Sequence, residues 1–413
     1  MSRVDLLSPQ SAVLRRWLSI VGIGEDGIDA LSPVARGLIG DAEVVFGGKR
    51  HLALASALIR GAARAWPTPF DRAVDEVLAQ RGRPVCVLAS GDPFVYGVGT
   101  VLARQINPAE MLAVPAPSAF SLAAARLGWA LPETAQVSLH GRALDLVRPH
   151  LQPGMRVLAL TSDRDGPAAV AHLLSETGFG ASSLIVLEAL GGRRERIRVT
   201  TAAKFDLREI DDLNIVAIDV KAAPGARVIA RAAGLSDAMF EHDGQITKRE
   251  IRAVTLSSLA PRRGELMWDI GAGSGSVAIE WMLADPSLRA IAIERRPDRA
   301  ARTRRNAAAF GVPGLEVVEG EAPEVLGSLP KPDAIFIGGG ANDALDAARS
   351  MLRGGGRLVV NAVTLETEAL LLARHATLGG ELVRLAITRA DAIGGKTGWR
   401  PAMPVTQWTW VKP

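Results

Sequence analysis

The stretch Trp268-Asp-Ile-Gly-Ala-Gly-Ser-Gly-Ser-Val-Ala-Ile-Glu-Trp-Met282 decides the fold of the second half of this 413-residue chain. An apolar run, 265–270, meets Gly271, Gly273 and Gly275, and a segment with helical periodicity, 277–283, follows. This order predicts a strand, a tight turn and a helix. Glycine is favoured where the backbone turns sharply and a ligand approaches it closely. The N-terminus of the following helix adds free N–H groups and a partial positive charge.

The spacing of these glycines indicates the ligand. A dinucleotide fingerprint, G-x-G-x-x-G, requires glycine at the position of Ser276. The run is instead G-x-G-x-G, which resembles the nucleotide loop of Rossmann-like methyltransferases and implies S-adenosylmethionine as the ligand. The next expected strand, 288–293, ends in Glu294, whose carboxylate we expect to accept hydrogen bonds from the ribose hydroxyls. NAD or another nucleotide, and a purely structural glycine turn, are the alternatives.

Composition sets the broad class of the protein. The length predicts two or three domains, and 48% hydrophobic residues with 42 glycines fit α/β architecture. The single cysteine, Cys86, excludes a disulfide framework, and the six histidines lack metal-ligand spacing, so we expect no metal site. The N-terminus lacks the pattern of a signal peptide and no apolar run reaches the length of a bilayer span, so we expect a cytoplasmic protein without membrane contact.

The charge balance suits an anionic ligand. The formal net charge is +4 and the sequence pI is about 9.5, which fits either nucleic acid or a polycarboxylate. The short basic runs Arg193-Arg194 and Arg262-Arg263 lie in expected loops, and we interpret them as solvated surface charge.

Three strand-to-helix loops mark the first half of the chain. An apolar strand, 17–21, leads into Gly22-Ile-Gly24, and Ser32 is expected to cap a helix that has Pro33 at its first position. A second strand, 84–89, leads into Ser90-Gly-Asp92-Pro-Phe-Val-Tyr96. A third strand, 111–114, leads into Pro115-Ala-Pro-Ser118, where Ser118 is suited to cap the next helix. Further alternation of strands and helices continues to about residue 219.

These three motifs, in this order, resemble the tetrapyrrole methylase family over roughly residues 17–218. The resemblance implies two α/β subdomains with S-adenosylmethionine in the cleft between them, bound in a mode that is not Rossmann-like. It also implies that Gly24, Asp92, Tyr96 and Ser118 line this cleft. For Asp92 the alternative is a local role as the cap of the following helix.

The second half reads as a seven-stranded sheet. After the glycine loop we expect strands at 315–318, 333–337 and 357–361, with 381–388 and 405–411 as a late antiparallel pair. Thr247, with Glu250 three residues later, fits a capping box at a helix N-terminus. The segment Ala390–Thr397 nearly forms a phosphate-binding Walker loop, but Ala390 replaces the required glycine. We therefore interpret this segment as a substrate-facing loop.

The segment from Phe240 to the C-terminus, including Asp243-Gly-Gln-Ile-Thr-Lys-Arg249, resembles the decarboxylating methyltransferase domain of the cobalamin pathway. The resulting division is a lead (1–16), a tetrapyrrole methylase domain (17–221), a linker (222–236) and a Rossmann-like methyltransferase domain (237–413). The resemblance implies one S-adenosylmethionine site per domain. It further implies methylation of a corrinoid precursor at C5 by the first domain, and methylation at C15 with loss of the C12 acetate carboxyl group by the second.

This resemblance and the loop pattern assign site residues in the second domain. The expected donor-binding residues are Gly271, Ala272, Gly273, Ser274, Gly275 and Glu294, with Ala322 beside the adenine and Thr247 near the donor. For Thr247 the alternative is a helix cap alone. Lys248, Arg249 and Lys396 are candidates to bind the substrate's carboxylates, although each could equally be solvated. Methyl transfer is an in-line displacement that gains most from alignment, so no catalytic nucleophile is assigned.

Two other functions stay open at this point, an RNA-directed methyltransferase and a non-catalytic binding module. The chain lacks the aromatic and basic array that RNA recognition uses, so we expect a small tetrapyrrole as the partner and no nucleic acid. A homo-oligomer is expected because relatives of the second domain assemble. The residues that carry decarboxylation, the order of the methylations and the transfer of the intermediate between domains do not follow from the sequence.

Overall fold

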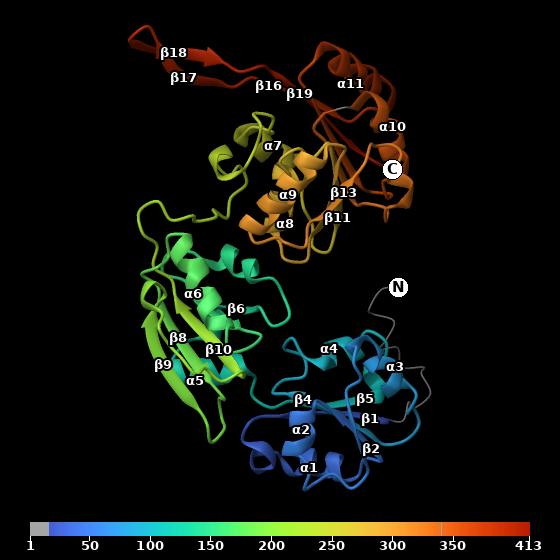
Figure 1. Cartoon of the computed structure of the whole chain (residues 1–413). Coiled ribbons are helices and arrows are strands. Elements are labelled where there is room, and N and C mark those ends of the chain that lie inside the picture. The colour runs from blue at the N-terminus through green and yellow to red at the C-terminus, as the bar shows by residue number, and fades with distance from the viewer. Residues whose placement is uncertain (1–15, 340) are drawn as a thin grey trace. The chain divides into compact units, whose positions relative to one another are not determined.

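The computed structural model describes residues 16–339 and 341–413 (Figure 1). The chain divides into two compact units, the first ending at Arg227 and the second running from Val228 to Pro413. A short segment, Asp145–Leu151, groups with the second unit.

The first unit contains a parallel sheet built from five strands. Their order is β3-β2-β4-β1-β5, and every pairing is parallel. Parallel strands are joined by helical crossovers that cover both faces, which is why the central strands are buried almost throughout. The elements are β1 (Leu18–Ile23), α1 (Pro33–Gly40), β2 (Val44–Gly47), α2 (Lys49–Leu54), β3 (Ala62–Ala65), α3 (Ala73–Leu78), β4 (Val85–Ser90), α4 (Val98–Leu102) and β5 (Met111–Val114).

A second, mostly antiparallel sheet completes this unit. Its order is β6-β7-β10-β8-β9, and only β6 and β7 pair in parallel. Phe120 of α5 packs into the core of this sheet with Leu158, Leu187 and Ile215. Two sheets with their own helices confirm the expected two-subdomain α/β fold. The elements are α5 (Ala119–Leu127), β6 (Thr134–Ser138), β7 (Arg156–Leu160), α6 (Gly166–Glu176), β8 (Ser183–Glu188), β9 (Arg196–Thr201) and β10 (Asn214–Asp219).

The second unit confirms the expected seven-stranded sheet. Its order is β13-β12-β11-β14-β15-β19-β16, with β19 antiparallel to both of its neighbours. Successive residues of β11 point to opposite faces, so Met267 and Trp268 belong to different apolar cores. The elements are α7 (Arg249–Leu259), β11 (Leu266–Ile270), α8 (Ser276–Ala284), β12 (Arg289–Glu294), α9 (Pro297–Ala309), β13 (Glu316–Glu319), β14 (Ala334–Ile337), α10 (Ala341–Met351), β15 (Arg357–Ala362), α11 (Leu365–Leu378), β16 (Glu381–Leu385) and β19 (Val405–Val411).

The expected loop at 390–397 is wrong, because this segment forms a β-hairpin. Strands β17 (Thr388–Ile393) and β18 (Lys396–Pro401) pair antiparallel, and β16 ends at Leu385 rather than near Thr388. Gly394 and Gly395 both have positive φ, 52° and 80°, which suits a two-residue hairpin turn. In Figure 1 the hairpin projects as a narrow arm beyond β16 and β19.

The expected capping box at Thr247 is also wrong. Helix α7 begins at Arg249 with Lys248 as its N-cap, and no side chain caps it. The Thr247 carbonyl instead accepts a hydrogen bond from Arg252, and the Glu250 carboxylate pairs with Arg389 of the hairpin. The helix thus begins one residue later than the box requires, and the carboxylate of the expected box is paired with the hairpin instead.

A buried ion pair holds α7 against α8. The side chain of Arg252 is completely buried, and its Nε donates to Oε1 of Glu280 at 2.6 Å. The Glu280 carboxylate also accepts from the backbone N–H groups of Gly234 and Leu235, at 2.7 and 2.9 Å. The segment that precedes α7 is thus tied to the helix that follows the glycine loop.

A search of residues 16–339 and 341–413 finds no helix with the length and apolar character to cross a bilayer. Within the same ranges there is also no cluster of three or more potential metal-ligating His, Cys, Asp or Glu side chains.

Candidate functional site

The three loops that the sequence singled out in the first unit meet at the carboxyl edge of the parallel sheet. The Gly91 N–H donates to Ile23 O at 3.2 Å, and Gly91 O accepts from Ala116 N at 3.3 Å. A Cβ on Gly22 would lie 1.9 Å from Gly91 O and 2.6 Å from Ala116 N. Glycine is therefore required where the first loop passes the other two.

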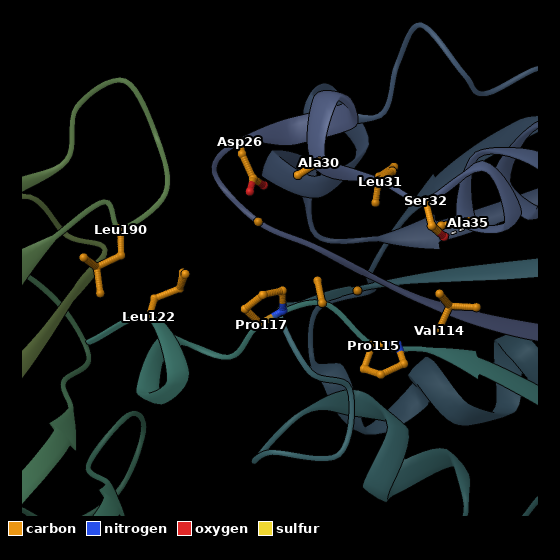
Figure 2. Close-up of a pocket in the computed structure, with 13 residues that line it drawn as sticks. Asp26, Ala30, Leu31, Ser32, Ala35, Val114, Pro115, Pro117, Leu122 and Leu190 are labelled. Atoms are coloured by element: carbon orange, nitrogen blue, oxygen red, sulfur yellow. Dashed lines mark hydrogen bonds between the residues drawn. The ribbon is translucent and has the colours of Figure 1, made fainter. Parts of the chain in front are cut away.

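A cavity of about 140 Å³ lies beside these loops (Figure 2). Gly22 and Gly24, which follow β1, contribute to its wall, and Leu122 of α5 and Leu190 after β8 approach from the other half of the unit. The remaining lining residues are Asp26, Ala30, Leu31, Ser32, Ala35, Val114, Pro115, Ala116 and Pro117. Apolar walls with exposed backbone and one carboxylate are compatible with S-adenosylmethionine, which combines an adenosyl group with positive charge.

The other predicted residues of the first unit are not among those that line this cavity. Asp92 Oδ1 accepts from Phe94 N at 2.8 Å, and Ser118 Oγ caps α5 by accepting from Ser121 N at 3.1 Å. The Tyr96 hydroxyl donates to Gln136 O at 3.2 Å, and its ring packs on Phe120. All three have hydrogen-bond partners within the protein, so their donor-binding role stays a prediction.

In the second unit, the glycine loop after β11 has the backbone conformation that glycine favours. Gly271, Gly273 and Gly275 have φ values of 73°, 59° and 73°. A Cβ on Gly275 would lie 2.6 Å from Cγ2 of Thr303 in α9, whereas around Gly273 the nearest atom would be 3.8 Å away. The loop therefore packs closely against α9 at Gly275 and leaves space at Gly273, where a ligand could approach the backbone.

Glu294 lies at the end of β12 and joins this loop directly. Its Oε2 accepts from Gly273 N at 2.9 Å and its Oε1 from Arg296 N at 3.0 Å, and the side chain is buried. Asp269 of β11 is buried close by and accepts from Ala278 N at 3.1 Å. Burial raises the pKa of Asp269 to about 7, the Ala278 N–H opposes this shift and the charge of Glu294 adds to it. The loop thus lies beside two carboxyl groups.

The segment 243–249 also lies beside the glycine loop. Gln245 O would be 3.8 Å from a Cβ on Gly273, and Thr247 Oγ1 would be 3.9 Å from a Cβ on Gly338, which follows β14. Asp243 anchors the segment to α9 through Arg299, at 2.9 Å, and Arg302, at 3.3 Å. Although burial acts in the opposite sense, hydrogen bonds from Arg299, the Gln245 N–H and Arg302 lower the pKa of Asp243 to about 2.

The remaining predicted donor residues differ in their surroundings. The Ser274 hydroxyl is buried and has no hydrogen-bond partner among the described residues. Ala272 donates its N–H to Ile293 O at 3.1 Å, so it fixes the loop against the end of β12. Ala322, which follows β13, is partly buried. It packs against the apolar core that contains Trp268, on the face of the sheet opposite to Met267.

The candidate substrate cations are exposed. Lys248 Nζ is 3.5 Å from Gly244 O, and Arg249 begins α7, so both adjoin the 243–249 segment. Lys396 begins β18 on the projecting hairpin, and no contact within the described residues ties it to the glycine loop. Lys248 and Arg249 therefore lie together at the end of the 243–249 segment, whereas Lys396 lies apart on the hairpin.

Two carboxylates that lie at the candidate sites were not among the residues predicted from the sequence. Asp26 lines the first-unit cavity and Asp269 is buried beside the glycine loop. Asp26 stands two residues after Gly24, and Asp269 two residues before Gly271, so proximity to the loop glycines was the available signal.

Comparison with known families covers both units. Residues 18–206 match the family of tetrapyrrole (corrin/porphyrin) methylases, and residues 238–412 match the precorrin methyltransferase domain. Fold and loops together therefore define a methyltransferase in which a tetrapyrrole methylase is joined to a precorrin methyltransferase domain. Methyltransferases of this kind use S-adenosylmethionine.

Similarity to named relatives extends over nearly the whole chain. A precorrin-6Y C(5,15)-methyltransferase [decarboxylating] of Sinorhizobium sp is 60% identical over 410 residues, 99% of each chain. A Mycobacterium tuberculosis protein of the same name is 41% identical over 400 residues, 95% of this chain and 99% of that one. The chain belongs to the family of decarboxylating precorrin-6Y C5,15-methyltransferases of cobalamin biosynthesis.

A shorter relative matches only part of the chain. A probable cobalt-precorrin-6B C(15)-methyltransferase (decarboxylating) of Saccharolobus solfataricus is 39% identical over 179 residues, 41% of this chain and 89% of that protein.

Proposed function

We propose that the chain methylates precorrin-6Y at C5 and C15 and removes the carboxyl group of the C12 acetate side chain, giving precorrin-8X. The observation that carries this proposal is the 60% identity, over 99% of each chain, to a relative named for this reaction. The RNA-directed alternative has no comparable support.

Each domain is proposed to have its own donor site and its own methylation. The shorter relative, named only for the C15 reaction and decarboxylation, matches over 179 residues, about the length of the precorrin methyltransferase domain at 238–412. We assign C15 methylation and decarboxylation to this domain. The C5 methylation then belongs to the tetrapyrrole methylase domain and its cavity beside Gly24.

Position and electrostatics would supply the catalysis in both domains. S-adenosylmethionine, when bound, supplies an electrophilic methyl group, so the protein needs to align the attacking carbon and exclude water. In the second domain the proposed ligands of the donor are the loop Gly271–Gly275, Glu294 and Ala322, with Thr247 beside them. Lys248, Arg249 and Lys396 would hold the substrate's carboxylates, and a homo-oligomer is the proposed assembly.

The test is mass spectrometry of the products that the full chain forms from precorrin-6Y and S-adenosylmethionine. The intact protein should add two methyl groups and release one molecule of carbon dioxide. Glu294→Ala removes the carboxylate proposed to accept from the donor's ribose and also frees Gly273 N. This variant should therefore add a methyl group at C5 only and retain the acetate.

Glu316→Ala is the matched control, because Glu316 is an exposed carboxylate on the neighbouring strand β13. It should behave like the intact protein. Loss of both methylations in Glu294→Ala would contradict independent donor sites, and no product from the intact protein would contradict the proposed reaction.

A further inference from the structure

The side chain of Asp26 occupies a distinctive place in the first-unit cavity. It is the single ionisable residue among those that line the cavity. Its Oδ1 would lie 2.7 Å from a Cβ on Gly24, and its Oδ2 3.8 Å from a Cβ on Gly191. The carboxylate therefore lies over the loop after β1 and faces the loop after β8, at the end of the cavity where Figure 2 shows Leu122 and Leu190.

Nearby cations do not neutralise this carboxylate. Within the described residues Asp26 makes no hydrogen bond or ion pair through its side chain, and it does not cap the short helix that follows it. Arg50 pairs with Glu25, and Arg194 pairs with Glu25 and Asp211. Arg193 lines a second, more open cavity that Asp26 also borders, together with Asp29 and Glu25. The surroundings of Asp26 thus carry surplus negative charge.

The chemistry of the methyl donor supplies a matching group. S-adenosylmethionine carries a positive sulfonium, and the product S-adenosylhomocysteine carries a neutral thioether in its place. The Asp26 carboxylate is exposed, so water partly screens its attraction for that charge, and the contact is as strong as a solvent-exposed ion pair. The amino group keeps its charge in both molecules, so only contact with the sulfonium separates donor from product.

We propose that Asp26 recognises the sulfonium of the methyl donor and so makes the first-unit site prefer S-adenosylmethionine to S-adenosylhomocysteine. This inference rests on the proposed donor site in the first domain. The carboxylate stabilises the charged donor before transfer and loses its counterion once the methyl group has left. Release of the product is thereby favoured over its retention.

The test is calorimetric titration of the full chain with S-adenosylmethionine and S-adenosylhomocysteine, in a Glu294→Ala background that silences the second-domain site. Asp26→Asn keeps the shape of the side chain and removes its charge. It should weaken donor binding about fivefold, the upper end expected for loss of one solvent-exposed ion pair, and leave product binding unchanged. The difference in donor affinity between Asp26→Asn and its parent should shrink at high salt, because salt screens the attraction between the carboxylate and the sulfonium in the parent protein.

Asp29→Asn is the matched control, because Asp29 borders the second cavity and not the first. It makes the same change of charge nearby and should leave both affinities unaltered. Equal weakening of donor and product by Asp26→Asn, or no weakening of either, would overturn the inference alone. If the Glu294→Ala parent bound no donor, the proposed first-domain site would itself fail, and the inference with it.

Discussion

Gly275 lies so close to α9 that the glycine loop after β11 cannot accommodate even one side-chain carbon at this position. Its φ is 73°, and a Cβ there would lie 2.6 Å from Thr303 Cγ2. Gly275→Ala therefore adds a steric clash of roughly 1–3 kcal/mol to a left-handed backbone strain of roughly 1 kcal/mol. We expect the second unit to unfold at a lower temperature and the chain to lose the donor binding proposed for this loop. Calorimetric melting and donor titration measure the two effects.

Two further variants separate clash from strain. Gly264 has a φ of 82° with no atom within 4 Å of its would-be Cβ, so Gly264→Ala should show the strain alone. Thr303→Ser removes the clashing Cγ2 and keeps the hydroxyl that donates to Gly273 O at 3.0 Å, so it should partly restore Gly275→Ala. Equal melting temperatures for Gly275→Ala and Gly264→Ala would show that the packing against α9 does not matter.

The residues that could be predicted from the sequence are those whose role depends on the backbone conformation of their own segment. The loop glycines and the caps Ser32 and Ser118 are of this kind, and the caps are confirmed. Asp26 and Asp269 are not, because their significance depends on what distant segments bring beside them. Gly191 reaches Asp26 from 165 residues further along the chain, and Asp269 gains its raised pKa from burial under α8 and from Glu294.

At the scale of secondary structure, apolar runs and turn residues predicted most strands of the parallel sheet and of the seven-stranded mixed sheet. These local patterns failed where side chains bind non-local partners. The strand at β11 and helix α8 follow from an apolar run and glycine spacing. Thr247 fitted a capping box, but α7 begins at Arg249 and the Glu250 carboxylate that the box requires pairs with Arg389 of the hairpin. Gly394-Gly395 is a hairpin signal, which the interpretation of residues 390–397 as a substrate-facing loop left unused.

The hairpin formed by β17 and β18 makes little contribution to the stability of its unit. All six residues of β17 are exposed, and the ion pair between Arg389 and Glu250 is partly solvated, so it contributes about 0–1 kcal/mol. The ends of the arm already meet, with Ala402 N donating to Ile387 O at 2.8 Å. Replacing residues 388–401 by Asn-Gly should therefore change the melting temperature by no more than about 3 °C.

Circular dichroism melting of the full chain checks this expectation. An exchange of the arm's turn, Gly394-Gly395 to Asn-Gly, is the control that keeps both strands. A fall in melting temperature well beyond that of the control would mean that the arm packs against a surface that the isolated chain leaves open.

For the whole molecule, the division into two units makes the position of the linker testable. Ile229 and Leu235 belong to the core of the second unit, and Gly234 and Leu235 donate to the buried Glu280 carboxylate. A fragment that begins at Val228 should therefore fold cooperatively. A fragment that begins at Asp237, the domain start expected from the sequence, should lose roughly 2–4 kcal/mol of unfolding free energy, because it lacks two apolar side chains and two hydrogen bonds to a charge.

Urea unfolding of the two fragments, each followed by tryptophan fluorescence, measures the difference. A fragment ending at Arg227 tests the first unit in the same way and should be folded. Equal stability of the two second-unit fragments would show that residues 228–236 serve only as a connector.

The buried pair of Arg252 and Glu280 also limits how the protein can evolve. A guanidinium does not give up its proton, so no change of pH can neutralise Arg252 when Glu280 is lost, and only the less buried Asp237, at 3.1 Å, would remain as a carboxylate partner. Replacing either residue alone leaves a buried charge at a cost of about 3–5 kcal/mol, whereas an apolar pair of similar volume could be tolerated. A change from the ion pair to an apolar pair, one residue at a time, therefore passes through a destabilised protein. The residues at positions 252 and 280 should accordingly covary among relatives.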